Sequence, residues 1–108
     1  MEDREKDIAT LKNELSVLLD REDEIFTELE KMEEEILRMK ENDLIDEAKE
    51  KSRALLPKLD EVIGLMKRKL ELTQHIFPDK VDEIKEILAS LIRKRNELAI
   101  IVGAEFIN

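Results

Sequence analysis

The spacing of apolar residues from Ile8 to Met39 constrains the fold more than any other feature of this sequence. Apolar side chains recur at alternating intervals of three and four, as in the heptad repeat of a coiled coil. The pattern predicts a long helix over about residues 4–41 that packs lengthwise against another helix. Only Glu22 interrupts the stripe, in which the a positions are Ile8, Leu15, Glu22, Leu29 and Ile36, and the d positions are Leu11, Leu18, Ile25, Met32 and Met39.

A second helix is predicted over about residues 43–77, after a tight turn at Asn42-Asp43. Asn42 suits the left-handed position after a helix end, and Asp43 suits the N-cap of the next helix. Two adjacent apolar stripes indicate that this helix touches two neighbours and is the central one. The first stripe is Ile45, Ala48, Ser52, Leu55, Leu59, Val62, Met66, Thr73 and Ile76, and the second is Leu56, Ile63, Leu70 and Phe77.

Pro57 lies inside the second helical pattern, and both stripes continue through it without a change of phase. A proline removes one backbone donor and its ring crowds the preceding turn, which bends a helix. We therefore expect a kink at Pro57, with a missing hydrogen bond at Arg53. The alternative is two separate helices joined near this proline.

The third helix is predicted over about residues 79–102. Phe77-Pro78-Asp79 separates it from the second, because a residue before proline avoids the helical region and Asp79 can cap the third helix. Gly103 ends it, and residues 103–108 form an apolar tail. The whole chain is then one all-α domain, an elongated antiparallel three-helix bundle or coiled coil with a proline-kinked central helix.

Helix lengths predict that the end of the bundle at the Asn42-Asp43 turn, which we call the tip, is incompletely covered. If the chain turns at the two breaks, two residues that lie at the same level on neighbouring helices have residue numbers with a constant sum. This sum is about 85 for the first and second helices and about 156 for the second and third. The third helix then ends about ten residues short of the first turn. We expect residual exposure at the tip and a client-binding surface edged by acids; its residues are Glu28, Met32, Glu33, Glu34, Glu35, Ile36, Met39, Ile45 and Ala48. The alternative is that Phe106 and Ile107 fold back over this gap.

Two charged residues occupy seam positions. By the predicted register, Glu22 of the first helix and Arg95 of the third lie at nearly the same level, beside Val62. We predict that they pair and fix the register of the three helices.

Charge and composition narrow the classes of function. The net charge is −9, and residues 1–42 hold fifteen acids against seven bases, which disfavours nucleic-acid binding. With no cysteine, one histidine (His75) and two glycines, the chain has no recognisable catalytic, metal or cofactor site, and we expect no enzyme. No apolar run approaches the roughly 18 residues of a membrane span, so we expect a cytoplasmic protein.

Two runs resemble tubulin-binding cofactor A. The first runs from Glu28 to Glu41 and is similar to that family's first helix. The second, Ser52-Arg53-Ala54-Leu55-Leu56-Pro57, is similar to its second helix and includes the kinking proline. The likeness covers about residues 15–72 and leaves the third helix unmatched. It implies a cytosolic chaperone that captures β-tubulin without nucleotide or metal.

We therefore expect a helical chaperone, monomeric or homodimeric, that binds a protein client and neither nucleic acid nor membrane. One alternative is a bacterial export chaperone or adaptor of the flagellar type. The other is a structural coiled-coil module that associates with a second copy of itself.

Overall fold

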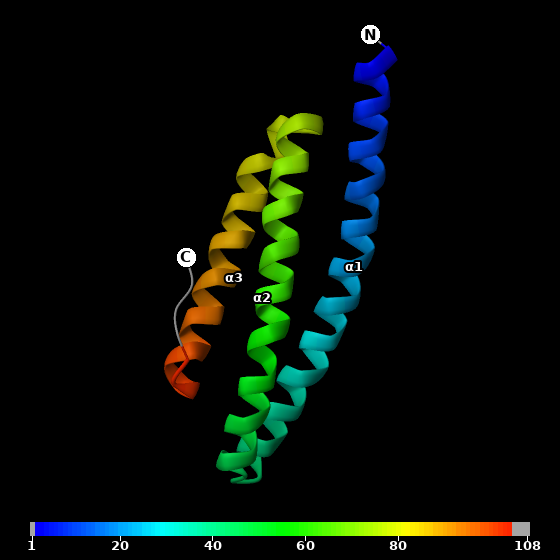
Figure 1. Ribbon diagram of the computed structural model, residues 1–108. Helices are drawn as coiled ribbons and strands as arrows, with labels where there is room; N and C mark the ends of the chain where they lie inside the picture. Colours follow the sequence, from blue (N-terminus) through cyan, green and yellow to red (C-terminus); the bar gives the residue numbers. More distant parts are fainter. Residues whose placement is uncertain (1, 105–108) are drawn as a thin grey trace.

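A computed structural model describes residues 2–104 of the chain, and their side chains from Asp7 onward. It contains α1 (Glu2–Glu41), α2 (Ile45–Ile76) and α3 (Val81–Val102), with a 3-10 turn, η1 (Pro78–Lys80), between the last two. The molecule measures 62 × 23 × 19 Å, and successive helices run antiparallel (Figure 1). The all-α, elongated three-helix prediction is confirmed, although α2 and α3 each begin two residues later than predicted.

The turn between α1 and α2 differs in detail from the prediction. Asp43, not Asn42, has the left-handed backbone, with φ 59°. The amide of Asp43 donates to the Lys40 carbonyl at 3.2 Å and that of Leu44 to the Met39 carbonyl at 2.8 Å, which is the Schellman pattern of a helix end. The Asn42 backbone is not left-handed, and the Asn42 side-chain amide donates to the Arg38 carbonyl at 2.9 Å. Leu44 is therefore the N-cap of α2, in place of Asp43.

Helix α2 continues through Pro57, so the alternative of two shorter helices is wrong. The proline nitrogen has no hydrogen to donate to the Arg53 carbonyl, as expected. Pro57 itself is exposed, while Leu55, Leu56 and Leu59 around it are buried. The proline therefore faces solvent, and the missing donor lies on the side of the helix where water can replace it.

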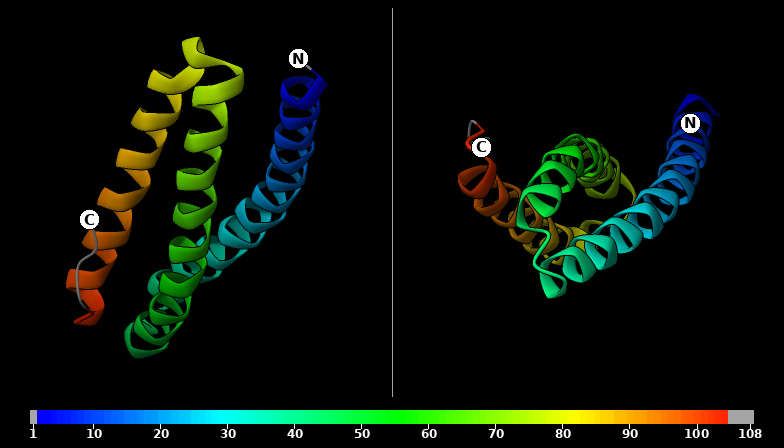
Figure 2. Two further views of the ribbon diagram at one scale, coloured as in Figure 1. Left: turned by 45° about the horizontal axis from the view of Figure 1, so that its top comes forward. Right: turned by 90° about the horizontal axis from the view of Figure 1, so that it is seen from below.

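The central position of α2 is confirmed. Both α1 and α3 pack against it, and among the described residues no Cα of α1 comes within 8 Å of a Cα of α3. Figure 2 shows that α1 diverges from the other two helices toward its N-terminus. The described side chains of residues 7–21 include no buried one, so the first half of the predicted seam is only partly covered.

One apolar core joins the three helices. Its fully buried centre is the pair Ile25 on α1 and Val62 on α2, each at 0% exposure. Other core residues are Leu29, Ile36, Ala48, Leu55 and Leu59, with Leu91 and Leu98 of α3 packed against them. The buried part of α1 thus begins at Glu22, whereas buried residues of α2 and α3 continue farther from the α1–α2 turn, at Met66, Leu72 and Ile84.

The predicted register holds between neighbouring helices. Ion pairs join Glu28 to Lys58 at 2.5 Å and Glu35 to Lys51 at 2.9 Å, each within one residue of the level predicted for α1 and α2. On the other side of α2, Arg95 contacts Asp60 at 2.7 Å, again within one residue. Helix periodicity and turn position therefore aligned α2 with α3 and with the part of α1 nearer the turn. Farther along α1, the pairs Arg21–Glu61, Glu14–Arg68 and Glu22–Lys69 depart from the predicted level by three to six residues.

Gly103 ends α3 with a left-handed backbone, φ 75°. The amides of Gly103 and Ala104 both donate to the Ala99 carbonyl. Phe106 and Ile107, which the sequence suggested as a cover for the tip, lie outside the described residues.

The two glycines give a matched test of backbone conformation. Gly64 lies in α2 with open space where a Cβ would stand, whereas Gly103 has a positive φ. Gly64→Ala should raise the free energy of unfolding by about 0.5–1 kcal/mol, because alanine loses less conformational entropy in a helix. Gly103→Ala should lower it by about 1 kcal/mol through left-handed strain. Urea denaturation of both variants measures this, and equal shifts of the same sign would contradict the assigned conformations.

Candidate functional site

A groove of about 430 Å³ lies where α3 stops short of the α1–α2 turn. In Figure 1 this is the lower end of the molecule, where α1 and α2 continue past the end of α3. We call it the tip groove; its lining residues are Glu33, Ile36, Lys40, Ile45, Ala48, Lys49, Ser52, Leu55, Leu59, Lys94, Glu97, Leu98 and Ile101. A groove therefore lies at the end of the bundle that the short third helix was predicted to leave uncovered.

The groove exists because the apolar stripe of α2 is longer than the helix that covers it. Stripe positions from Ile45 to Leu59 are spaced by three, four, three and four residues. Helix α3 has 22 residues against 32 in α2, so it covers only the upper part of the stripe. Two apolar side chains of the groove lining are exposed: Ile45 of α2 at 59% and Ile101 of α3 at 58%.

The prediction of residual exposure at the tip is right for some residues and wrong for others. Ile45 is exposed, and Met32 and Met39 are half-buried. Ile36 and Ala48 are buried, at 8% and 2% exposure, against the prediction. The small Ala48 side chain allows close approach of α1 and α2, so the two helices bury this part of their seam without a third.

The predicted binding residues divide between two faces of the hairpin. Glu33, Ile36 and Ile45 line the tip groove. Met39 instead lines an acidic groove of about 470 Å³, which we call the opposite groove, with Asp46, Glu47, Glu50, Lys51 and Ala54. Met32 packs against the core. The set predicted as one surface is therefore not continuous.

The four acids predicted to edge the site all have cationic partners. Glu28 contacts Lys58 and Glu35 contacts Lys51, as described above, while Glu34 lies 3.6 Å from Arg38 and Glu33 pairs with Lys94 of α3. These carboxylates thus link helices or neighbouring turns instead of forming a free acidic edge.

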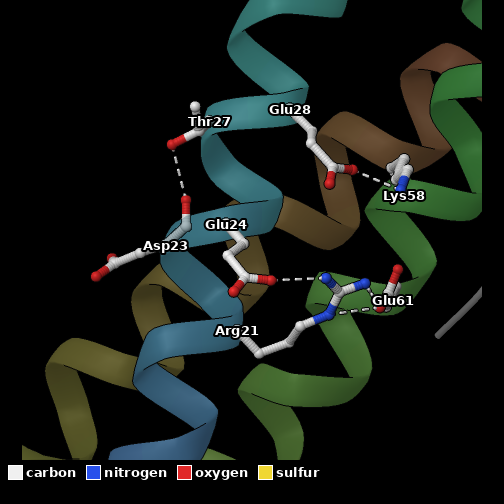
Figure 3. A network of polar contacts seen from close by, with 7 residues as sticks. All are labelled: Arg21, Asp23, Glu24, Thr27, Glu28, Lys58 and Glu61. Atoms are coloured by element: carbon white, nitrogen blue, oxygen red, sulfur yellow. Dashed lines mark hydrogen bonds and ion pairs between the residues drawn. The ribbon is translucent and has the colours of Figure 1, made fainter.

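Figure 3 shows the Glu28–Lys58 pair beside a second α1–α2 contact, in which Arg21 binds both Glu24 and Glu61. The Lys58 ammonium, by its hydrogen bond, holds the pKa of Glu28 below its ordinary value. In the same way, hydrogen bonding from Arg68 holds the pKa of Glu14 below its ordinary value. Both shifts mean that these α1 carboxylates are stabilised in their charged forms by α2 cations.

The unpaired charges at the tip groove are of a different kind. Within the described part of the chain, the ammonium groups of Lys40 and Lys49 have no hydrogen bond or ion pair, and neither does the carboxylate of Glu97. Lys40 and Lys49 lie on the two arms of the hairpin near the turn, and Glu97 lies near the end of α3. Sequence reasoning missed these residues because a single charge carries no periodic signal.

Glu22 and Arg95 are both buried, at 8% and 7% exposure, as their seam positions predict. The Glu22 carboxylate accepts hydrogen bonds from Lys69 at 3.3 Å. Arg95 donates to Asp60 through Nε at 2.7 Å. The structure thus gives each a partner on α2 that the sequence had not suggested, and the direct Glu22–Arg95 pair stays a prediction.

The tip groove offers an apolar floor with charged side chains at its edges. Ser52, the buried hydroxyl in the lining, donates to the Ala48 carbonyl at 2.8 Å and is thereby satisfied. Among residues 7–104, no three histidine, cysteine or acidic side chains are grouped so that they could hold a metal ion. In the same range none of the helices has an apolar stretch long enough to cross a bilayer.

Comparison with known proteins identifies no relative: no family model, no curated protein and no solved structure matches this chain. The likeness to tubulin-binding cofactor A therefore rests on the two quoted runs alone.

The Glu22–Lys69 contact predicts a stability effect. Lys69→Met should lower the free energy of unfolding by about 2 kcal/mol, because it leaves a mostly buried carboxylate without its ammonium. A Glu22→Leu/Lys69→Met double variant should recover that loss, since two apolar side chains suit the seam. Guanidinium denaturation measures both. If Lys69→Met alone matches the parent protein, another cation neutralises Glu22, and Arg95 is then the one to replace.

The two shifted glutamates predict a reciprocal pair of titrations. Carboxyl NMR should show the pKa of Glu28 returning to its ordinary value in Lys58→Gln and that of Glu14 in Arg68→Gln, with the other glutamate unchanged each time. Because both folded pKa values are lowered, the ion pairs stabilise the protein above the ordinary pKa of about 4.3 and lose this effect as the pH falls through the folded value. The variants should therefore differ from the parent protein at pH 7 and converge with it in acid.

Proposed function

We propose that this protein is a helical chaperone or adaptor that holds an apolar segment of a client protein in the tip groove. The observation that carries the proposal is the apolar stripe of α2 continuing past the end of α3. An apolar helix stripe in water needs a partner surface, and here the partner helix stops before the stripe does. The proposal thus places the client where a longer α3 would have packed.

The exposed isoleucines support a binding role on energetic grounds. Ile45 and Ile101 each keep more than half of their surface in water. Full burial of such a side chain contributes roughly 1.5–3 kcal/mol, so covering both recovers on the order of 2 kcal/mol. The surrounding lining is already packed and ordered, which limits the entropic cost of binding.

The client suggested by family resemblance is β-tubulin. What supports it is the likeness of residues 28–41 and 52–57 to tubulin-binding cofactor A, including Pro57 at the matching place. The same likeness suggests that client capture needs no nucleotide and no metal. β-Tubulin is therefore the first client to test.

A second candidate function is self-association through the first half of α1. This half diverges from α2 and α3 (Figure 2), and none of its described side chains up to Arg21 is buried. Of the seam residues in this half, Ile8 is 39% exposed, and Leu11, Leu15 and Leu18 are half-buried. A second copy could cover this seam, and light scattering that gives the mass of a dimer would favour this function.

Client capture should depend on the tip groove. An Ile45→Glu/Ile101→Glu double variant should bind purified tubulin at least about tenfold more weakly, because both acids would stand on the apolar lining. Leu37→Glu/Ile100→Glu is a matched control, since these side chains are 58% and 68% exposed and lie outside the lining. Circular dichroism checks that each variant stays helical.

Undiminished capture by the groove variant would place the client elsewhere, with the first half of α1 as the next surface. No capture by the parent protein would reject β-tubulin as the client.

A further inference from the structure

We infer that the occupant of the tip groove is an amphipathic helix of a partner protein, aligned end to end with α3 and carrying carboxylates toward its own C-terminal end. The inference rests on the proposed function, because it specifies the kind of segment that the groove takes. Shape, charge and helix polarity support it independently.

The groove has the shape of a missing helix. Its floor follows the helical spacing of α2 from Ile45 to Leu59, and one wall is α1 at Ile36. The last turns of α3, from Lys94 to Ile101, line its upper part. Such a surface accepts side chains at helical intervals and offers no free strand edge to an extended segment. Because α3 is ten residues shorter than α2, the uncovered length is on the order of 15 Å, or about three helical turns.

The unpaired charges define which helix fits. Lys40 and Lys49 stand at the turn end of the groove without partners among the described residues, and Glu97 stands at the α3 end. The remaining charges of the lining, Glu33 and Lys94, neutralise each other. A complementary segment therefore has carboxylates near the turn and a base or an N-terminus near α3.

Helix polarity gives the same direction. The C-terminal end of α3, with its partial negative charge, is directed toward the α1–α2 turn (Figure 1) and favours the N-terminus of a helix that continues in that direction. The C-terminal end of that helix then lies near Lys40 and Lys49, which stabilise its partial negative charge. Both effects select an occupant parallel to α3 and antiparallel to α2.

The charges of the opposite groove explain why an acidic segment would bind in the tip groove and not on the other face of the hairpin. The opposite groove is lined by Asp46, Glu47 and Glu50, and its one cation, Lys51, is paired with Glu35. Glu50 is likewise paired, with Arg53, which leaves Asp46 and Glu47 as like charges for carboxylates that approach that face. On the other face such carboxylates meet free ammonium groups. The two sides of the hairpin therefore discriminate between partners by repulsion as well as attraction.

The test uses two fluorescent twelve-residue peptides with one apolar face of leucines at helical spacing. The first carries glutamates in its last turn, and the second carries lysines at the same positions. Anisotropy titrations of the full chain at low salt should show about tenfold tighter binding of the acidic peptide, with the preference reduced in 0.5 M salt. Lys40→Gln/Lys49→Gln should remove most of the preference, and Lys12→Gln/Lys85→Gln, an equal change of charge on exposed lysines outside the lining, should leave it.

Orientation is tested with a nitroxide on the last residue of the acidic peptide. Since the protein has no cysteine, the label attaches to the peptide alone. Amide signals of residues 40–45 should broaden more than those of residues 97–101, and the reverse would overturn the parallel arrangement.

Four results would overturn the inference. Equal or tighter binding of the basic peptide, with both peptides weakened by Ile101→Glu, would reject the charge assignment and leave the proposed function standing. A dimer that Ile101→Glu dissociates would make a second copy the occupant. Acidic-peptide binding that tightens more than tenfold when the chain ends at Ala104 would make the C-terminal tail the occupant. If neither peptide binds and Ile45→Glu/Ile101→Glu captures the client normally, the proposed function fails as well.

Discussion

Close packing between α1 and α2 supports every other feature of this molecule. Ile25, Leu29 and Ile36 of one helix meet Ala48, Leu59 and Val62 of the other, and this seam stays buried even where no third helix covers it. Helix α3 adds a cover over part of α2, and the tip groove is the part left open. If the two-helix tip could not bury its own seam, the groove would lack a fixed floor.

Charged residues in this protein divide into those that hold the helices and those that remain available. The acids of α1 that face α2 are tied to Lys51, Lys58 and Arg68, and such exposed pairs contribute little stability each but favour one alignment. The net charge of −9 is therefore a poor guide to the partner. Where the lining of the tip groove leaves charge unpaired, two of the three groups are cations, the reverse of what overall composition suggests.

Periodicity was sufficient to predict the helices, their order and the register of neighbouring helices close to the α1–α2 turn, because these depend on repeat length and turn position. It could not predict that α1 diverges from α3, since a heptad pattern carries no information on the angle between helices. Residue preference placed the left-handed backbone at Asn42, but hydrogen bonding of Leu44 to Met39 required it one residue later. The seam charges Glu22 and Arg95 were recognised as buried, whereas their α2 partners Lys69 and Asp60 depended on side-chain reach that spacing does not encode.

The uneven burial of α1 has a mechanical consequence. Its 40 residues form one helix about 60 Å long, and all its buried side chains among the described residues lie from Glu22 onward. The helix is thus held at the core, and its shorter part beyond the core forms a wall of the tip groove. A tilt of about 5° around Ile36 displaces the far end by roughly 4 Å, given a rise of about 1.5 Å per residue. A ligand that tilted α1 from within the groove would therefore also displace a surface some 50 Å distant.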